Sequence, residues 1–256
     1  MTPADHQGVL VPTDQGPGRV RVFPARERRG TLLLGHGAGG QRDSPDLLAL
    51  TALADHGWTV VLVDQPWRVA GRRVATAPPR LDAAWRQVVA ALALLTDVPG
   101  APEAPGSHRE GRAPAAPGSP GAQHGIPLPR PWVLGGRSAG ARVACRTSVA
   151  QDGTPVPGVA AVVCLSFPLH PPGRPDRSRA DELVLPVRAG LPTLVVQGSA
   201  DPFGGPDEVR RAVPDPLLTV VPVRGTHSPA DLPALSTAVR MLLDGLPTAD
   251  PEDPPP

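Results

Sequence analysis

Short apolar runs alternate with longer amphipathic stretches through most of this chain. The short runs are rich in Val, Leu and Ala and lack polar residues at alternate positions, which is typical of strands buried on both faces of a parallel sheet. Predicted strands cover residues 19–23, 31–34, 59–63, 132–134, 159–165, 193–196 and 218–221. Predicted helices cover residues 45–56, 81–96, 139–150, 206–212 and 229–243. This alternation predicts an α/β fold, with a mostly parallel central sheet, helices on both faces and right-handed crossovers.

Proline and glycine mark the limits of the predicted domain. The chain of 256 residues holds 37 prolines and 28 glycines, and many of them gather in residues 98–130, where few apolar residues occur. Such a segment cannot offset the entropy cost of its own ordering. We therefore expect one α/β domain over 19–246 with a disordered insertion at about 98–130, a flexible segment over 1–18 and a disordered tail over 247–256.

Charge and composition exclude several classes of function. The formal net charge is +1, which argues against a nucleic-acid-binding surface. No apolar stretch approaches the roughly 20 residues needed to span a bilayer, and the N-terminus lacks the pattern of a secretory signal. Ligand pairs with the short spacing of a structural metal site are also missing from the sequence. We expect a cytoplasmic protein that acts on a small-molecule substrate without a metal or cofactor.

The strongest chemical signal is the sequence G-R-S-A-G at 136–140, which joins a predicted strand directly to a predicted helix. The pattern G-x-S-x-G in this strand–turn–helix context is typical of a nucleophile elbow. The glycines leave room for a tight turn, and the helix N-terminus behind the serine favours developing negative charge. Ser138 is therefore the candidate nucleophile.

Two further residues follow strand ends in the order that such a nucleophile requires. Asp201 comes after the strand at 193–196, and His227 comes after the strand at 218–221. Ligands and catalytic groups gather at the carboxyl ends of strands in open α/β sheets, and the order Ser…Asp…His fits a catalytic triad on such a sheet. Asp176 is a rival for the acid because it follows an earlier strand end.

The glycine loop G-H-G-A-G-G at 35–40 follows another strand and suits an oxyanion hole. In hydrolases with an H-G-x-G motif, the amide after H-G and the amide after the nucleophile hold the oxyanion. Those amides belong here to Ala38 and Ala139. The same loop supports a competing interpretation, because Gly35, Gly37 and Gly40 spell the dinucleotide motif G-x-G-x-x-G.

The dinucleotide interpretation gains from Asp64, an acidic residue at the end of the next strand. It fails on the helix start, because a pyrophosphate site needs the helix to begin inside the glycine motif. Here Q-R-D-S-P intervenes, and Ser44 followed by Pro45 marks the start of the helix. The dinucleotide interpretation also leaves the serine, aspartate and histidine candidates without a role.

Several motifs together resemble the bacterial α/β-hydrolase-like family. They are G-H-G-A-G-G, V-D-Q-P-W-R-V-A-G-R-R, L-D-A-A-W-R, L-G-G-R-S-A-G-A-R-V-A, C-L-S-F-P-L-H-P-P-G-R-P and V-V-Q-G-S-A-D-P-F-G. That family is related to dienelactone hydrolases and to the hydrolase-like domain of testis-expressed and KANL-type chromatin-complex proteins. The resemblance covers roughly residues 19–243 and implies the α/β-hydrolase fold with a Ser138–Asp201–His227 triad. Relatives commonly carry G-[RK]-S-M-G, whereas Ala139 stands here in place of the methionine.

The sequence favours a serine hydrolase that cleaves an ester-like bond through an acyl-enzyme. The segment between residues 165 and 190 is too short for a large lid domain, which favours small or accessible substrates. Further candidates for substrate contacts are His36, Arg73, Arg137 and His170. A catalytically silent binding or scaffold protein with the same fold is the alternative.

Overall fold

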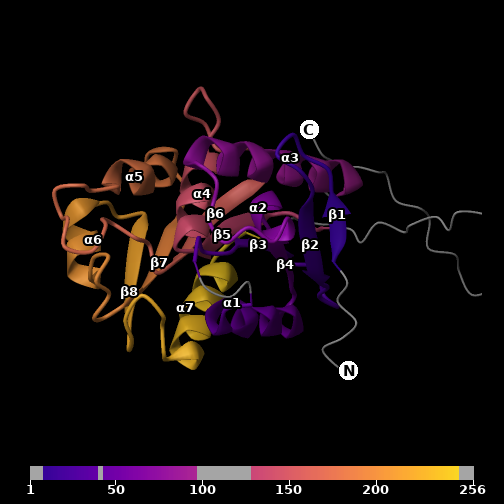
Figure 1. Cartoon of the computed structure of the whole chain (residues 1–256). Coiled ribbons are helices and arrows are strands. Elements are labelled where there is room, and N and C mark those ends of the chain that lie inside the picture. Colours follow the sequence, from indigo (N-terminus) through magenta and orange to yellow (C-terminus); the bar gives the residue numbers. More distant parts are fainter. Residues whose placement is uncertain (1–7, 40–42, 97–127, 248–256) are drawn as a thin grey trace, which may run out of the picture.

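The structure is a computed structural model that describes residues 8–39, 43–96 and 128–247. Its centre is one eight-stranded sheet with the order β1-β2-β4-β3-β5-β6-β7-β8 (Figure 1). The pairs β1–β2 and β2–β4 are antiparallel, and every other pair is parallel. The strands are β1 (Val9–Val11), β2 (Gly18–Phe23), β3 (Gly30–Gly35), β4 (Trp58–Asp64), β5 (Trp132–Arg137), β6 (Val159–Leu165), β7 (Thr193–Gly198) and β8 (Leu218–Val223).

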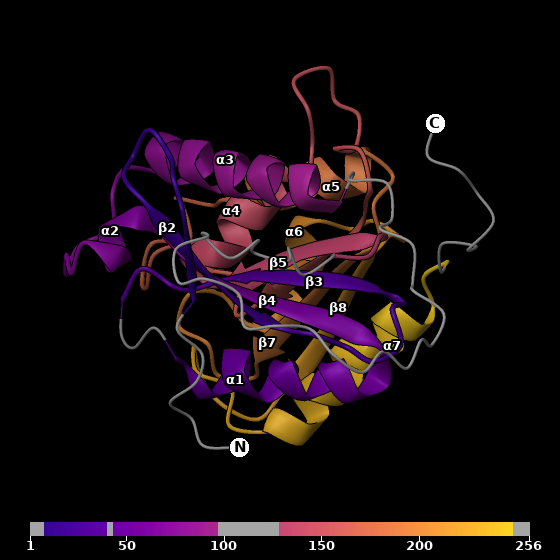
Figure 2. The same ribbon diagram turned by 90° about the vertical axis from the view of Figure 1, so that its right-hand side faces the viewer.

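Helices cover both faces of the sheet, so the domain has three layers with the sheet in the middle (Figures 1 and 2). The helices are α1 (Pro45–Ala49), the 3₁₀ helix η2 (Leu50–His56), α2 (Pro66–Val69), α3 (Pro78–Thr96), α4 (Ala139–Thr147), α5 (Ala180–Arg188), α6 (Pro206–Ala212) and α7 (Leu232–Asp244). One face packs against α3, α4, α5 and α6, whose buried side chains include Trp85, Val143, Leu183 and Val209. The other face packs against α1, η2 and α7 through residues such as Leu47, Leu50 and Leu235. The predicted α/β class with helices on both faces is confirmed.

The central strands are apolar because both of their faces are covered. Leu32, Leu33 and Leu34 of β3 are fully buried, and they alternate between the two cores. Parallel strands in this position have no solvent-exposed face, so the sequence carries an apolar run there in place of an alternating pattern. Within the described residues, no helix is both long enough and apolar enough to cross a membrane.

Three elements and several boundaries differ from the sequence prediction; the elements are helices α2 and α5 and strand β1, which is described below. Helices α2 and α5 were not predicted, because α2 is a single turn and Pro186 inside α5 weakens the helical pattern. The predicted helix 45–56 divides into α1 and the 3₁₀ helix η2. The predicted helix 229–243 begins only at Leu232, because the carboxylate of Asp231 caps it by accepting from Ala234 N at 3.1 Å.

The expectation of a flexible segment over 1–18 is wrong for residues 8–18. Val9–Val11 forms β1, which pairs antiparallel with β2 and buries Val11. The alternation in β1 is too short to recognise, since only its third residue faces the core.

The predicted insertion at 98–130 lies outside the described residues up to residue 127. Leu128, however, is buried and accepts a hydrogen bond from Trp132 Nε1. The predicted tail lies outside the described residues from residue 248 onward.

Candidate active site

Ser138 occupies a sharp turn between β5 and α4. Its φ of 53° and ψ of −110° lie outside the backbone regions that residues other than glycine normally adopt. The turn needs glycine on both sides, because a Cβ on Gly136 would lie 2.5 Å from the carbonyl oxygen of Gly35. A Cβ on Gly140 would collide with the same oxygen. The backbones of β3, β5 and α4 are therefore in close contact at this turn. The turn places Ser138 beyond the carboxyl end of β5.

A chain of hydrogen bonds joins Ser138 to the residues predicted as base and acid. His227 Nε2 lies 2.9 Å from Ser138 Oγ, and His227 Nδ1 lies 2.9 Å from Asp201 Oδ2. Asp201 accepts only, so Nδ1 carries the proton of a neutral ring and Nε2 accepts from the serine hydroxyl. The residues come from the loops after β5, β7 and β8, all at the carboxyl edge of the sheet. The geometry is that of a nucleophile with an oriented general base.

Asp201 is held by contacts that the sequence analysis did not identify. Its carboxylate is fully buried and accepts from Gln197 Nε2 at 3.0 Å and from Phe203 N at 2.9 Å. The Phe203 ring also lies against the imidazole of His227, with ring centroids 4.2 Å apart. Gln197 is a polar residue inside the apolar strand T-L-V-V-Q-G, which was the signal available in the sequence. The rival acid Asp176 is exposed and pairs with Arg174 at 3.2 Å.

The glycine loop after β3 is held in place by His36. Gln65 N donates to His36 Nε2 at 3.0 Å, so the ring donates from Nδ1 to the carbonyl oxygen of Gly37 at 2.8 Å. That carbonyl belongs to the same peptide group as the amide of Ala38, and the two point in opposite directions because the peptide is planar and trans. The histidine thus fixes the direction of the Ala38 amide. Burial lowers the pKa of His36, which favours the neutral ring that both hydrogen bonds require.

Comparisons with known proteins support the fold that carries this site. Residues 122–232 match the model of a family described as an alpha/beta hydrolase domain, and this range contains the serine, the aspartate and the histidine. No curated protein sequence matches the chain. Among solved structures, an alpha-beta serine hydrolase homologue from Coxiella burnetii is similar with a TM-score of 0.61 at 15% identity, covering 95% of this chain and 96% of that one.

Two further solved structures show the same architecture. An α/β serine hydrolase without lid from Xanthomonas campestris has a TM-score of 0.59 at 19% identity, with 96% of this chain and 99% of that chain covered. A dienelactone hydrolase from Anabaena variabilis has a TM-score of 0.55 at 19% identity, with 93% and 94% covered. The chain has the α/β-hydrolase fold.

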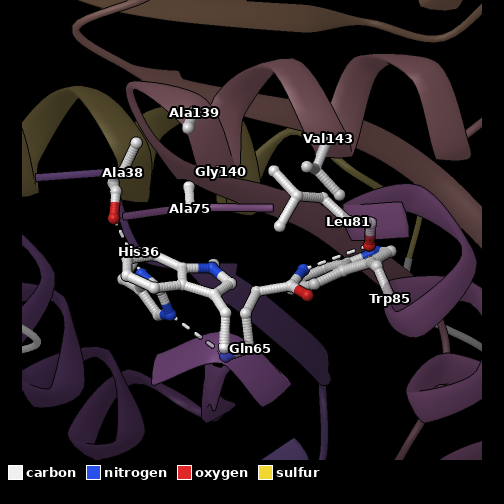
Figure 3. Close-up of a pocket in the computed structure, with 12 residues that line it drawn as sticks. His36, Ala38, Gln65, Ala75, Leu81, Trp85, Ala139, Gly140 and Val143 are labelled. Carbon is white, nitrogen blue, oxygen red and sulfur yellow. Dashed lines mark hydrogen bonds between the residues drawn. The ribbon is translucent and has the colours of Figure 1, made fainter. Parts of the chain in front are cut away.

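Two cavities of different size border the start of α4, where Ala139 lines both of them. The smaller, about 10 Å³, lies beneath the glycine loop between His36, Gln65 and Trp85, with Ala139 and Gly140 above it (Figure 3). It is too small for a substrate and holds at most about one water molecule. The larger, about 420 Å³, opens on Ser138 and His227 and is the candidate substrate pocket.

The four further candidates for substrate contacts occupy different positions around this α/β-hydrolase site. Arg137 lines the substrate pocket, but its guanidinium pairs with Asp46 at 3.0 Å and donates to the carbonyl oxygen of His227 at 2.9 Å. His36 is buried beneath the glycine loop, as described above. Arg73 is exposed in a separate surface hollow with Arg68 and Arg72. His170 is buried and lies 3.2 Å from a carboxylate oxygen of Glu208, away from the lining of the pocket.

The helix after the glycine loop begins where the sequence indicated. Helix α1 starts at Pro45, with Ser44 as its N-cap and Pro at its first position. It begins at Pro45, beyond the last glycine of the motif at Gly40, whereas a dinucleotide motif opens its helix within the glycines. Within the residues that the structure describes, no three His, Cys, Asp or Glu side chains gather as metal ligands would.

Proposed function

We propose that this chain is a serine hydrolase that cleaves a carboxylic ester or a related acyl bond of a small molecule. One observation carries the proposal: Asp201, His227 and Ser138 form a continuous hydrogen-bonded chain, and Ser138 stands in a strained turn at the start of α4. An ordinary serine is a weak nucleophile, and a base within hydrogen-bond reach is what activates it. Strain at such a position is characteristic of functional sites.

The proposed reaction has two halves. Ser138 Oγ attacks the acyl carbon while its proton passes to His227 Nε2, and the alcohol leaves with that proton. Water then attacks the acyl-enzyme, with His227 again as the base, and releases the acid. Asp201 holds the ring in the required tautomer and stabilises the imidazolium. The amides of Ala38 and Ala139 receive the developing oxyanion.

Similar proteins support this proposal in part. The neighbours described above are named as serine hydrolases and a dienelactone hydrolase, and one of them is described as lacking a lid. The short segment between β6 and α5 accords with a site open to small substrates. We also infer, from the motif F-P-L-H-P-P-G at 167–173, the narrower relationship to the hydrolase-like domain of testis-expressed and KANL-type proteins.

A fluorophosphonate probe tests the proposal without knowledge of the substrate. The probe reacts covalently only where nucleophile, base and oxyanion hole act together, so the purified chain should be labelled at Ser138. Ser138→Ala and His227→Ala should each abolish labelling, because members of a triad act as a unit. Ser199→Ala is the matched control, since Ser199 Oγ donates to a backbone carbonyl oxygen at 3.0 Å and labelling should persist.

The result that would overturn the proposal is equally specific. Folded protein that neither takes up the probe nor hydrolyses short nitrophenyl esters would point to the catalytically silent scaffold. Labelling mapped to a serine other than Ser138 by mass spectrometry would show that the nucleophile is misassigned. Among the described residues, Ser166 is the other serine with a positive φ, but its side chain is fully buried.

A further inference from the structure

The substrate pocket is lined by an excess of positive charge. Three arginines line it, Arg137, Arg142 and Arg179, and none of the lining residues that the structure describes is acidic. The remaining polar lining comes from Ser138 and His227, and Pro168 and Phe203 contribute apolar surface. The charge of each arginine depends on what lies behind it.

Two of the three arginines are neutralised from outside the pocket. Arg137 pairs with the buried carboxylate of Asp46 at 3.0 Å. Arg142 binds Glu182 through two nitrogen atoms, with Nε 2.8 Å from one carboxylate oxygen. Burial raises the pKa of Glu182, but the hydrogen bonds and charges of Arg142 and Arg146 outweigh it and lower the pKa overall. Both pocket arginines therefore already have a carboxylate partner.

Arg179 is different, because its partner is neutral. Its Nη1 donates to the carbonyl oxygen of Pro168 at 2.8 Å, and within the described part of the chain no carboxylate lies within ion-pair distance of it. Burial lowers the pKa of Arg179 and the neighbouring Arg142 lowers it further, while the charge of Glu182 acts in the opposite direction without forming an ion pair. A guanidinium stays charged in proteins, so Arg179 brings to the pocket a positive charge with no described carboxylate paired directly to it.

We propose that this pocket selects ester substrates that carry a carboxylate, and that Arg179 is the residue that binds it. The inference rests on the proposed hydrolase function, since the same pocket holds Ser138. A planar guanidinium can bind a carboxylate through two parallel hydrogen bonds. The hydrogen bond from Arg179 to the carbonyl oxygen of Pro168 holds the side chain at the pocket wall before substrate binds. A neutral ester would leave the charge of Arg179 uncompensated in a partly buried site.

Matched pairs of esters test this selectivity. One pair varies the acid half, 4-nitrophenyl hydrogen adipate against 4-nitrophenyl hexanoate, and the other varies the alcohol half, 4-acetoxybenzoate against its methyl ester. In at least one pair the wild-type kcat/KM should favour the anionic member by about 10- to 100-fold, the range expected for one hydrogen-bonded charge. The preference should shrink as salt rises, because ions screen a partly exposed charge.

Substitution of Arg179 separates recognition from chemistry. Arg179→Gln should remove the preference, mainly through a higher KM for the anionic ester, so that kcat/KM for the anionic ester falls by more than kcat/KM for the neutral ester does. Arg179→Lys keeps a charge and should restore part of the preference. Arg177→Gln is the matched control, because Arg177 is exposed two residues away and does not line the pocket.

The possible failures are distinguishable. If the wild type is labelled at Ser138 and hydrolyses neutral esters without preferring either anionic one, the carboxylate inference is overturned and the hydrolase proposal stands. If no ester is cleaved and no label is taken up, the hydrolase proposal fails. Calorimetric titration with adipate then tests the pocket alone, since binding by wild type that Arg179→Gln abolishes supports the anion site. Equal binding or none by both proteins rejects it.

Discussion

The guanidinium of Arg137 donates to the backbone carbonyl oxygen of His227 over 2.9 Å, so the residue next to the nucleophile holds the loop of its base. The same Nη2 lies 3.0 Å from Ser228 Oγ, and Nε is anchored on Asp46. Asp46 lies on α1, so the link also ties the elbow to the helix after the glycine loop. The Arg137–Asp46 ion pair therefore connects the turn at Ser138, the loop of His227 and helix α1.

Arg137→Gln should lower kcat more than it raises KM. Loss of the anchor lets the His227 loop shift, and a displacement of about 1 Å in a catalytic group can cost about 100-fold in rate. Breaking the pair also leaves the charge of the buried Asp46 unmatched, and the cost in the free energy of unfolding should stay below the roughly 3–5 kcal/mol of a fully buried pair, because Arg137 is only partly buried. Ester kinetics and chemical denaturation measure the two effects. The control is Arg29→Gln, which removes a 2.7 Å ion pair far from the site and should leave kcat unchanged.

Asp201→Asn should reduce kcat by about 10⁴-fold. The amide can donate to His227 Nδ1 and so stabilises the wrong tautomer, as the equivalent change does in a serine protease. Asp176→Asn should be nearly silent, because Asp176 is exposed and contacts only Arg174 among its described ion pairs. The reverse pattern in the kinetics of the two variants would place the acid in the loop before α5.

The sequence was sufficient to predict those parts of the fold and site that depend on local pattern. The buried strands of the parallel sheet carry apolar runs, and the serine lies in a strand–turn–helix motif that needs its glycines. Contacts such as Arg137 with His227 join residues 90 positions apart, and no local pattern encodes them. The proposed role of Arg179 could not be predicted from the sequence either. It depends on which carboxylates pair with the neighbouring arginines, and only the folded structure shows these pairs.

The stability of the protein should depend on pH through His36. Burial lowers its pKa in the folded state, whereas the unfolded chain takes up a proton near the ordinary value of about 6.5. The unfolded state therefore binds more protons below that value, so the free energy of unfolding is fully retained above it and falls as the pH decreases. Denaturation at a series of pH values measures the slope. His36→Gln should flatten it between about pH 7 and pH 5, and an unchanged slope would assign the dependence to other groups.

Gly140→Ala should destabilise the protein although Gly140 lies in a helix. Alanine in place of glycine normally favours a helix by about 1 kcal/mol. Here the new methyl group would overlap the backbone of Gly35 and His36, and overpacking of this kind costs about 1–3 kcal/mol. Thermal denaturation should show a lower Tm. Gly39→Ala provides the contrast, because a Cβ there would meet no atom of the described residues within 4 Å and the Tm should hold.

The pocket wall formed by Pro168 and Arg179 belongs to the connection between β6 and α5, which supplies none of the serine, histidine or aspartate of the proposed triad. Residues 172–178 of that connection are exposed to solvent and carry little of the core. If Arg179 sets the substrate preference as proposed, this preference and the proposed triad are encoded in separate stretches of the gene. A library of variants that changes only this connection can therefore be selected for activity on new substrates while Ser138, Asp201 and His227 stay unchanged.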